Sequence, residues 1–331
     1  MNLFEQLDSP ISLIDVGAVG DLPVHWLPLA PHLSVYGFEP DEEACKALNE
    51  QANRFTQACF HPVVVGGAKE KRPFNITRHG ECSSLLLPYQ DWLDRFSYGS
   101  CFEIIRSPVV ITRSLDEIEY HEEDGIDAIK IDSQGMELPI FKGAEKTLES
   151  TFLLEVETGL HENYHDETTF DQIAPYLRSK GFTCLQLHNQ PPETRNNTAS
   201  GWARNQGQPM ACESIWLRDL VGSESHSFPM TRSKAFRCLT LCANFGFLDF
   251  GLELAGFFLQ SGLLNKNEFS QLEIEDSWVI EKEEIKPRLA TLLAHLTHLL
   301  PTPLRRDLAA VLPEVIEKPN FLKHLFRIDR R

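Results

Sequence analysis

The stretch from Leu13 to Pro40 decides the fold, reading L-I-D-V-G-A-V-G-D-L-P at residues 13–23 and V-Y-G-F-E-P at residues 35–40. The first part predicts an apolar strand over residues 11–16 that ends near Asp15 and turns through Gly17 and Gly20. The second part predicts another strand, which ends on Glu39. A strand, a glycine turn, a helix-length gap and a second strand ending on an acid are typical of a nucleoside-binding βαβ unit.

Two acids beside the glycine turn narrow the choice of nucleoside. A dinucleotide would place its pyrophosphate at this turn, which should then be free of negative charge. Here Asp15 precedes the turn and Asp21 follows it. Carboxylates at these positions repel phosphate and suit an ammonium or a sulfonium, which favours S-adenosylmethionine. Glu39 stands where it can accept hydrogen bonds from both ribose hydroxyls. The alternative is an ordinary turn whose acids cap a helix.

The bulk composition excludes several classes of function. The chain has 331 residues, enough for about two domains, and a formal net charge of −17. This charge argues against a nucleic acid or an anionic membrane as a partner, because the chain offers neither a basic field. Its eight cysteines contain no C-x-x-C pair and lie mostly in apolar runs. That usage, with an acidic N-terminus unlike a signal peptide, predicts a cytoplasmic protein.

No membrane span is expected. The most apolar window, residues 245–264, is interrupted by Asp249 and Glu253. Two carboxylates in the middle of a span would cost several kcal/mol. We therefore expect a buried amphipathic helix there.

Short apolar runs alternate with helical segments through the first two thirds of the chain, which predicts an α/β fold. The last two strands are joined only by a polar loop and should be antiparallel neighbours. Two further short strands are expected within an insertion, over residues 73–78 and 108–112. The seven main strands are predicted at 11–16, 34–39, 60–65, 126–132, 151–157, 182–188 and 212–218.

The character of the sequence changes after residue 220. Residues 221–229 form a predicted linker between a first domain, 1–220, and a helical domain, 230–331, of unknown role. Leucines at positions 289, 292, 293, 296 and 300 mark one face of a helix in that second part. We expect the helical domain to serve in oligomerisation or partner contact.

The strand at 126–132 delivers Asp132 to the carboxyl end of the sheet, on the same edge as Asp15 and Glu39. Ligands of open α/β sheets bind along that edge. We therefore expect Asp132 to lie near the cofactor, either as a catalytic base or as support for the amino acid end of the cofactor.

The segment F-L-L-E-V-E-T-G-L-H adds more ionisable groups to this edge. Glu155 and Glu157 are two residues apart on a strand and so share a face, and His161 follows in the next loop. Together with Asp132 they could form a pocket that abstracts a hydroxyl proton or binds a divalent metal. We assign Asp132, Glu157 and His161 as candidate catalytic residues, and Glu155 as a candidate substrate residue.

Several motifs resemble, in order and spacing, the FkbM-type S-adenosylmethionine-dependent methyltransferases. They are D-V-G-A-x-G, F-E-P, S-S-L at 83–85, R-S-L-D-E-I at 113–118, I-K-I-D-x-x-G-x-E followed by K-G-A, and L-L-E-V. The resemblance covers about residues 10–220. It implies a class I methyltransferase fold, which is Rossmann-like, and methylation of a hydroxyl on a sugar, glycan or glycosylated natural product.

The resemblance also implies site residues. Asp15, Gly17, Gly20, Glu39 and Asp132 would bind the cofactor, together with Pro40 of F-E-P and Ser84 of S-S-L. The chain departs from the family at one position, where D-S-Q-G at 132–135 replaces D-V-E-G. The amide of Gln134 removes a carboxylate, so no metal ligand is assigned and a divalent metal is not supported.

The run His161 to His165 matches H-E-x-x-H, the zinc peptidase signature, but it follows a strand and Gly159 rather than lying within a long helix. The polar loop 189–210 contains Trp202 and Arg204. If it covers the active-site edge, both are candidate substrate residues, the first as a flat apolar face for a sugar and the second as a donor.

Two competing functions remain open from the sequence. One is an NAD(P)-dependent sugar-modifying enzyme, disfavoured by the acids at the first turn and by the lack of a Tyr-x-x-x-Lys pair. The other is a methyltransferase-like assembly or binding protein with weak catalysis, which the change at Gln134 keeps open.

Overall fold

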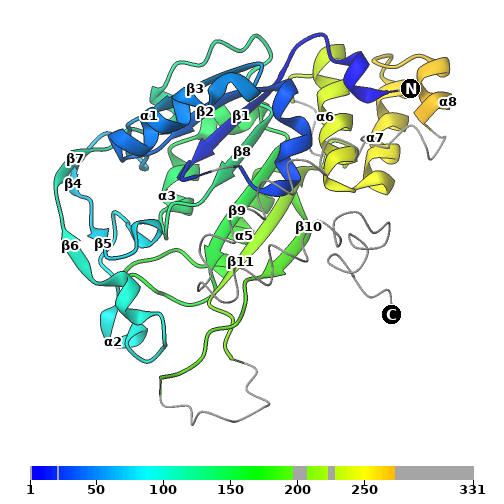
Figure 1. Ribbon diagram of the computed structural model, residues 1–331. Coiled ribbons are helices and arrows are strands. Elements are labelled where there is room, and N and C mark those ends of the chain that lie inside the picture. The colour runs from blue at the N-terminus through cyan, green and yellow to red at the C-terminus, as the bar shows by residue number, and fades with distance from the viewer. Residues whose placement is uncertain (1, 21, 197–206, 223–227, 273–331) are drawn as a thin grey trace, which may run out of the picture. The chain divides into compact units, whose positions relative to one another are not determined.

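The computed structural model describes residues 2–20, 22–196, 207–222 and 228–272 (Figure 1). Seven strands form one sheet in the order β10-β11-β9-β8-β1-β2-β3. All of them run parallel except β11, which is antiparallel to both of its neighbours. The predicted α/β fold with a seven-stranded, mostly parallel sheet and an antiparallel last strand is confirmed.

The strands lie close to their predicted positions. The main shift is in β3, which begins three residues and ends four residues before the run predicted at 60–65. The observed strands of the sheet are β1 (Ile11–Val16), β2 (Leu33–Phe38), β3 (Gln57–His61), β8 (Ala128–Ile131), β9 (Leu153–Gly159), β10 (Phe182–Asn189) and β11 (Ala211–Arg218).

The segment that follows β1 is not an α-helix. It forms the 3-10 helix η2 (Val24–His32), which contains Pro28 and Pro31. Proline lacks the amide hydrogen that an α-helix needs at interior positions. Other short 3-10 turns are η1 (Leu3–Gln6), η3 (Ala52–Arg54), η4 (Gly80–Cys82), η5 (Gly99–Phe102) and η6 (Leu115–Glu117).

The two faces of the sheet are covered differently. Ile14, Ile129 and Leu154 point to one face and pack in a core with apolar residues of the helices α3 (Glu137–Lys142), α4 (Glu145–Ser150) and α5 (Phe170–Ser179). The alternate residues Asp15, Lys130 and Glu155 point to the other face, because side chains alternate along a strand. Trp26 of η2 packs on that second face, where it hydrogen-bonds Glu155.

An insertion between β3 and β8 borders the carboxyl end of the sheet (Figure 1). Its four short strands pair as β4 (Lys71–Pro73) with β7 (Val109–Ile111) and β5 (Ile76–Thr77) with β6 (Ile104–Arg106). β5 and β7 lie within the extra strands predicted at 73–78 and 108–112, whereas β6 and most of β4 lie outside the predicted ranges. The insertion also holds the short helix α2 (Gln90–Leu93), and α1 (Glu42–Glu50) lies between β2 and β3 in the chain.

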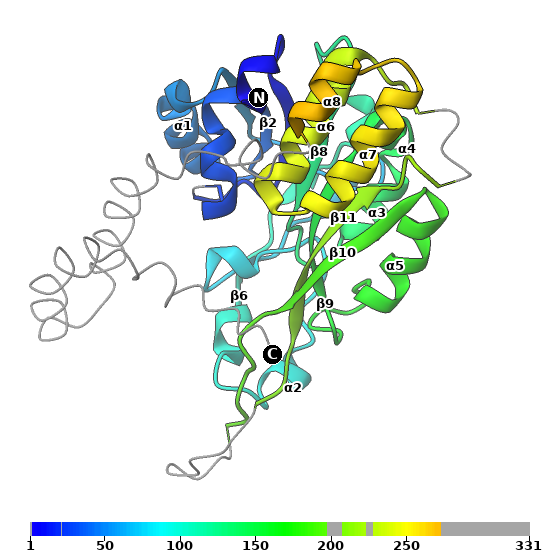
Figure 2. The same ribbon diagram turned by 90° about the vertical axis from the view of Figure 1, so that its right-hand side faces the viewer.

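Three helices follow the sheet and lie side by side (Figure 2): α6 (Arg232–Phe245), α7 (Leu248–Gln260) and α8 (Lys266–Leu272). α6 is tied to the sheet by buried ion pairs, in which Asp127, just before β8, contacts Lys234 and Arg237. The compact unit that contains the sheet extends from Met1 to Trp278, and residues 279–331 form a second unit. The domain boundary at the linker 221–229 stays a prediction, and the leucine face at 289–300 lies outside the described residues.

The apolar window at 245–264 forms α7, in which Leu254 and Phe258 are buried while Leu252 is 37% exposed. Within the described residues, no helix has the length and apolar character needed to cross a membrane.

Candidate functional site

The glycine turn after β1 brings the ends of β1, β2 and β8 together. Gly17 has a φ of 76°, and its amide donates to the carbonyl of Phe38 at 3.0 Å. A Cβ atom at position 17 would lie 2.1 Å from the carbonyl oxygen of Asp132. Only glycine fits there, because a side chain would collide with backbone and would have to adopt a left-handed conformation. Gly20 also has a positive φ, of 74°, but a Cβ there would meet nothing within 4 Å.

Asp15 does not carry an uncompensated charge. Its carboxylate is buried and forms an ion pair with Lys130 Nζ at 2.9 Å, in register on the neighbouring strand. Burial alone would lower the pKa of Lys130, but the negative charges of Asp15 and Asp132 raise it above its usual value. Asp21 lies outside the described residues. The contact of Asp15 with a cofactor stays a prediction. The ion pair with Lys130 already compensates the negative charge of Asp15.

Glu39 ends β2 with one carboxylate oxygen free for a ligand. Oε1 accepts a hydrogen bond from the amide of Asp41 at 2.8 Å. Oε2 is buried and has no partner among the described residues. Burial raises the pKa of Glu39, opposed by the Asp41 hydrogen bond. A buried acceptor without a partner is costly, so this oxygen is suited to a ligand hydroxyl. Pro40 follows it and is partly buried.

Asp132 is held at the end of β8 by Gln134. The Gln134 side-chain amide donates to Asp132 Oδ1 at 2.7 Å, and its Oε1 accepts from the Tyr164 hydroxyl at 2.9 Å. Burial raises the pKa of Asp132, while Lys130 and the Gln134 hydrogen bond oppose that rise. Gln134 adopts a φ of 53°, and Ser84 Oγ donates to its carbonyl at 2.6 Å. Ser84, predicted to bind the cofactor, thus supports the loop that carries Asp132.

This geometry explains how the amide of Gln134 can bridge Asp132 and Tyr164. An amide can donate to Asp132 and accept from Tyr164 at the same time, whereas an ionised carboxylate has no hydrogen to donate. Gln134 therefore orients Asp132 without adding a further negative charge.

Glu157 lies beside Asp132 at the same level of the sheet, because Ile131 and Val156 are paired in the parallel register of β8 and β9. Burial and then the charge of Asp132 raise the pKa of Glu157 to about 8, opposed by a hydrogen bond with Gln190. Near pH 7 Glu157 therefore holds a proton. Both carboxyl groups of the pair have raised pKa values, and two such neighbouring groups are suited to general acid and base chemistry.

Glu155 and His161 diverge from this pair. The carboxylate of Glu155 is buried against η2, where it accepts from the indole of Trp26 and lies 3.0 Å from His25 Nε2. His161 is exposed, with its ring centroid 5.6 Å from that of Trp92. The roles of Glu155 in substrate binding and of His161 in catalysis stay predictions.

The H-E-x-x-H run lies in bends and turns, as its position after a strand indicated. Tyr164 within it is buried, while His161 and His165 are exposed. Among the described residues, no group of three or more histidine, cysteine and acidic side chains is arranged to hold a metal ion.

The sequence did not single out the carboxyls of Glu137 and Glu167 as part of this cluster. Glu137 Oε1 accepts from the amides of Ser133 and Gly135 and from the Ser133 hydroxyl, so it closes the loop that carries Asp132. Its Oε2 is buried without a partner among the described residues. Burial raises the pKa of Glu137 to about 7 and that of Glu167 to about 8.

We expect Glu137 to make the protein less stable as the pH rises. Its pKa is raised from 4.5 to about 7 on folding, so the folded state binds the proton more tightly. The resulting stabilisation is complete below pH 4.5 and is lost as the pH rises to 7, an effect of about 3 kcal/mol. Glu137→Gln should flatten this decline, measured as the free energy of unfolding in urea between pH 5 and pH 8. An unchanged slope would contradict the assignment.

Trp202 and Arg204 lie outside the described residues, so their roles as substrate residues stay predictions. The two sides of their loop approach each other at the pair Glu193 and Gln208. Arg195, in the same loop, stacks on Phe96 at 4.3 Å from the ring centroid. The start of this loop is therefore anchored to the insertion.

The strand order is that of a class I methyltransferase, and a family comparison agrees with it. Residues 15–184, just over half of the chain, match the model of the methyltransferase FkbM domain. The chain belongs to the FkbM methyltransferase domain family. The resemblance inferred from the motifs is confirmed, and family and fold together support methyl transfer as the activity.

Solved structures were also compared with this FkbM-domain chain. An rRNA methylase from Streptococcus thermophilus has 13% identity and a TM-score of 0.32, covering 65% of this chain and 91% of its own. The N-terminal domain of EvdMO1, solved with S-adenosylhomocysteine bound, has 9% identity and a TM-score of 0.31, with coverages of 65% and 77%. The N-methyltransferase NodS from Bradyrhizobium japonicum has 7% identity and a TM-score of 0.31, with coverages of 65% and 90%. No curated protein matches the chain.

Proposed function

We propose that this protein is an S-adenosylmethionine-dependent O-methyltransferase that acts on a hydroxyl of a sugar, glycan or glycosylated natural product. The observation that carries the cofactor assignment is the buried Oε2 of Glu39, which has no partner among the described residues. It stands at the tip of β2, next to the glycine turn. A ribose hydroxyl would supply the hydrogen that this oxygen lacks.

Other residues of the site fit the same cofactor. Gly17 allows the turn to pass close to Asp132, and the ion pair of Asp15 with Lys130 keeps the underlying strands in register. Asp132 follows β8 with its backbone carbonyl against Gly17, so a base at its carboxylate would lie next to the bound cofactor. Pro40 and Gly20 complete the proposed contacts.

S-adenosylmethionine, when bound, supplies a methyl group already activated by its positive sulfur. The task of the protein is then to align the acceptor oxygen, which can contribute on the order of 7 to 11 kcal/mol. Asp132, oriented by Gln134, is the proposed acceptor of the hydroxyl proton. Glu157 is protonated near pH 7 and is the proposed donor of a hydrogen bond to the acceptor.

The acceptor class rests on the family and on the chemistry of this pair. A hydroxyl must lose a proton on methylation, and the pair of Asp132 and Glu157 can take one. His161, whose ring centroid lies 5.6 Å from that of Trp92, is a proposed contact of the acceptor. Glu155, Trp202 and Arg204 are further proposed acceptor contacts.

The test of the cofactor assignment is calorimetric titration of the protein with S-adenosylhomocysteine and with NAD. We expect saturable binding of the first only. Glu39→Ala should weaken S-adenosylhomocysteine binding roughly 10- to 100-fold, because the ribose loses its hydrogen bond to the buried Oε2. Binding of NAD in place of S-adenosylhomocysteine would overturn the proposal and favour the NAD(P)-dependent alternative.

Glu42→Gln is the matched control for this test. Glu42 is exposed at the start of α1, three residues from Glu39, and its change removes one negative charge near the site. Its affinity for S-adenosylhomocysteine should stay within about twofold of the wild type. Cofactor binding without methyl transfer to any hydroxyl in a panel of sugars and glycosides would favour the assembly-protein alternative.

A further inference from the structure

The insertion between β3 and β8 carries an exposed apolar strand. Residues 71–77 pair antiparallel with residues 104–111, through β4 with β7 and β5 with β6. We call this two-stranded element the ribbon. Its second strand has no further strand partner among the described residues. Eleven large apolar residues are exposed in the described part of the chain, and four of them lie on this strand, namely Ile104, Ile105, Val109 and Ile111.

These side chains are strongly exposed. Val109 is 71% exposed and Ile105 is 62% exposed, the two highest values among those eleven residues. Apolar residues of this size gathered on one element of a protein mark a site of interaction more often than isolated ones do.

The charge of this region is opposite to that of the chain as a whole. In residues 66–82 and 103–113, Lys and Arg outnumber Asp and Glu by six to three, whereas the chain has a net charge of −17. Two of the three acids are engaged, Glu70 with Arg72 and Glu103 with Arg78. Exposed Lys69, Lys71 and Arg106 have no ion-pair partner in the described part of the chain.

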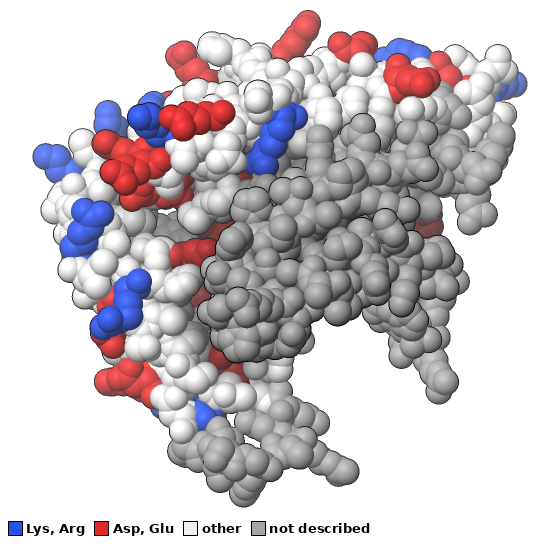
Figure 3. All heavy atoms as spheres, in the orientation of Figure 1, with Lys and Arg blue, Asp and Glu red and all other residues white. Residues whose placement is uncertain are grey.

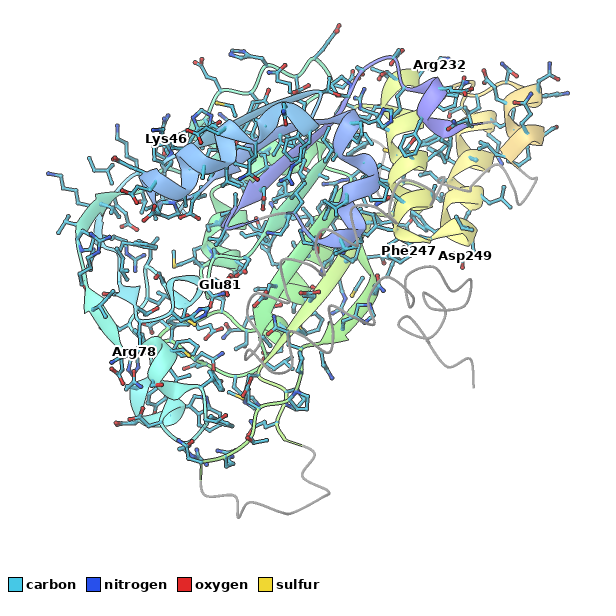
Figure 4. All side chains as sticks on the ribbon, viewed as in Figure 1. Lys46, Arg78, Glu81, Arg232, Phe247 and Asp249 are labelled. Atoms are coloured by element: carbon cyan, nitrogen blue, oxygen red, sulfur yellow. The ribbon has the colours of Figure 1, made fainter. Side chains whose placement is uncertain are left out.

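The figures place these groups along one edge of the molecule. Figure 1 shows β4, β6 and β7 on its left-hand side, and Figure 3 shows Lys and Arg side chains along that side, with uncharged surface and some Asp and Glu side chains between them. Figure 4 shows Arg78 on the outer side of the insertion and Glu81 on the side that faces the strands of the sheet. Burial raises the pKa of Asp132 most, and the charge of Glu81 adds a smaller effect in the same direction. Glu81 therefore lies on the side of the candidate site.

We propose that the ribbon is a docking surface for an anionic lipid membrane. β-branched side chains can enter the headgroup region while the flanking Lys and Arg contact lipid phosphates, which adds about 1 kcal/mol per cation. The net charge of −17 does not prevent this, because charges more than about 8 Å apart in water are largely screened at physiological salt. The local positive charge of the ribbon, and not the net charge of the chain, then determines whether it is attracted to the lipid phosphates.

A second copy of the chain fits the ribbon less well. Pairing two ribbons about a twofold axis would bring two surfaces with an excess of Lys and Arg together, and these repel. Anionic lipid headgroups impose no such repulsion.

The ribbon is joined directly to the candidate site. Asn75, between β4 and β5, pairs through its backbone with Ser84, whose hydroxyl donates to the carbonyl of Gln134. A membrane bound at the ribbon would therefore lie against the element that supports Asp132.

The test is flotation of the full chain with vesicles. We expect binding to vesicles of equal parts phosphatidylglycerol and phosphatidylcholine, weaker binding at high salt, and at least tenfold weaker binding to pure phosphatidylcholine. Ile105→Ser with Val109→Ser, and separately Lys71→Glu with Arg106→Glu, should each weaken binding to the anionic vesicles at least tenfold. These readouts need no cofactor or acceptor, so their failure is distinct from failure of the proposed function.

Two control variants match these changes elsewhere on the surface. Leu252→Ser alters an exposed leucine of α7, and Lys266→Glu reverses an exposed charge at the start of α8. Both should bind the anionic vesicles as the wild type does. Equal binding to neutral vesicles, or no binding to anionic ones, would overturn the proposal. So would a dimer in light scattering that the two ribbon variants dissociate, since the occupant would then be a second copy.

Discussion

Gly17→Ala should destabilise the protein by at least about 3 kcal/mol and weaken S-adenosylhomocysteine binding at least 100-fold. A left-handed conformation costs a residue with a side chain about 1 to 2 kcal/mol. The new Cβ would also lie 2.1 Å from the carbonyl oxygen of Asp132. Relief of that overlap must move backbone at the end of β1 or β8, and with it the carboxylate of Asp132. Displacement of a positioned group by 1 Å can cost about 100-fold in activity.

Gly20→Ala separates the cost of the left-handed backbone from the cost of the overlap with Asp132. Gly20 has nearly the same φ, 74°, but nothing lies within 4 Å of a Cβ at that position. Its substitution should cost only about 1 to 2 kcal/mol, from backbone strain alone. Urea denaturation and calorimetry with S-adenosylhomocysteine give both quantities. Equal destabilisation by the two variants would show that the close approach to Asp132 does not limit position 17.

Asp127→Asn should destabilise the protein by about 3 to 5 kcal/mol. Asp127 is 1% exposed, and it accepts hydrogen bonds from Lys234 Nζ at 3.0 Å and Arg237 Nε at 2.8 Å. It also accepts from the amide and hydroxyl of Ser12. Neutralising this carboxylate leaves Lys234 buried without a charge partner. A buried cation in that state loses its hydration and gains no compensating attraction.

Two further variants test this explanation by urea denaturation. Lys234→Met in the Asp127→Asn background should recover part of the lost stability, because it removes the uncompensated charge. Glu145→Ala breaks the ion pair with Lys180, in which Glu145 is 59% exposed. That change should cost less than about 1 kcal/mol, since water already solvates both groups. A similar loss in Asp127→Asn and Glu145→Ala would show that burial does not govern the Asp127 network.

The strands could be predicted because their signal is local. Apolar runs bounded by glycine, proline and polar residues marked all seven strands of the sheet, and the polar loop before residue 212 marked the antiparallel pair. The type of helix that follows β1 could not be predicted in the same way. Its prolines at 28 and 31 convert the segment to the 3-10 helix η2.

The positions of the candidate site residues could be predicted from the sequence, but the partners of their side chains could not. The order of the strands places Asp15, Glu39, Asp132 and Glu157 along one edge of the sheet, as expected from their positions at strand ends. The sequence could not show that Lys130 takes up the charge of Asp15, or that Trp26 takes up that of Glu155. Each of these contacts joins residues more than 100 positions apart.

The sequence by itself determined the positions of the strands, the glycine turn and the family, because each depends on residues close together in the chain. The tertiary structure alone decided which acids are free to act. Burial among other carboxyls raises the pKa of Glu157 to about 8, and the amide of Gln134 orients Asp132. Both effects depend on desolvation and on neighbours brought together only by folding.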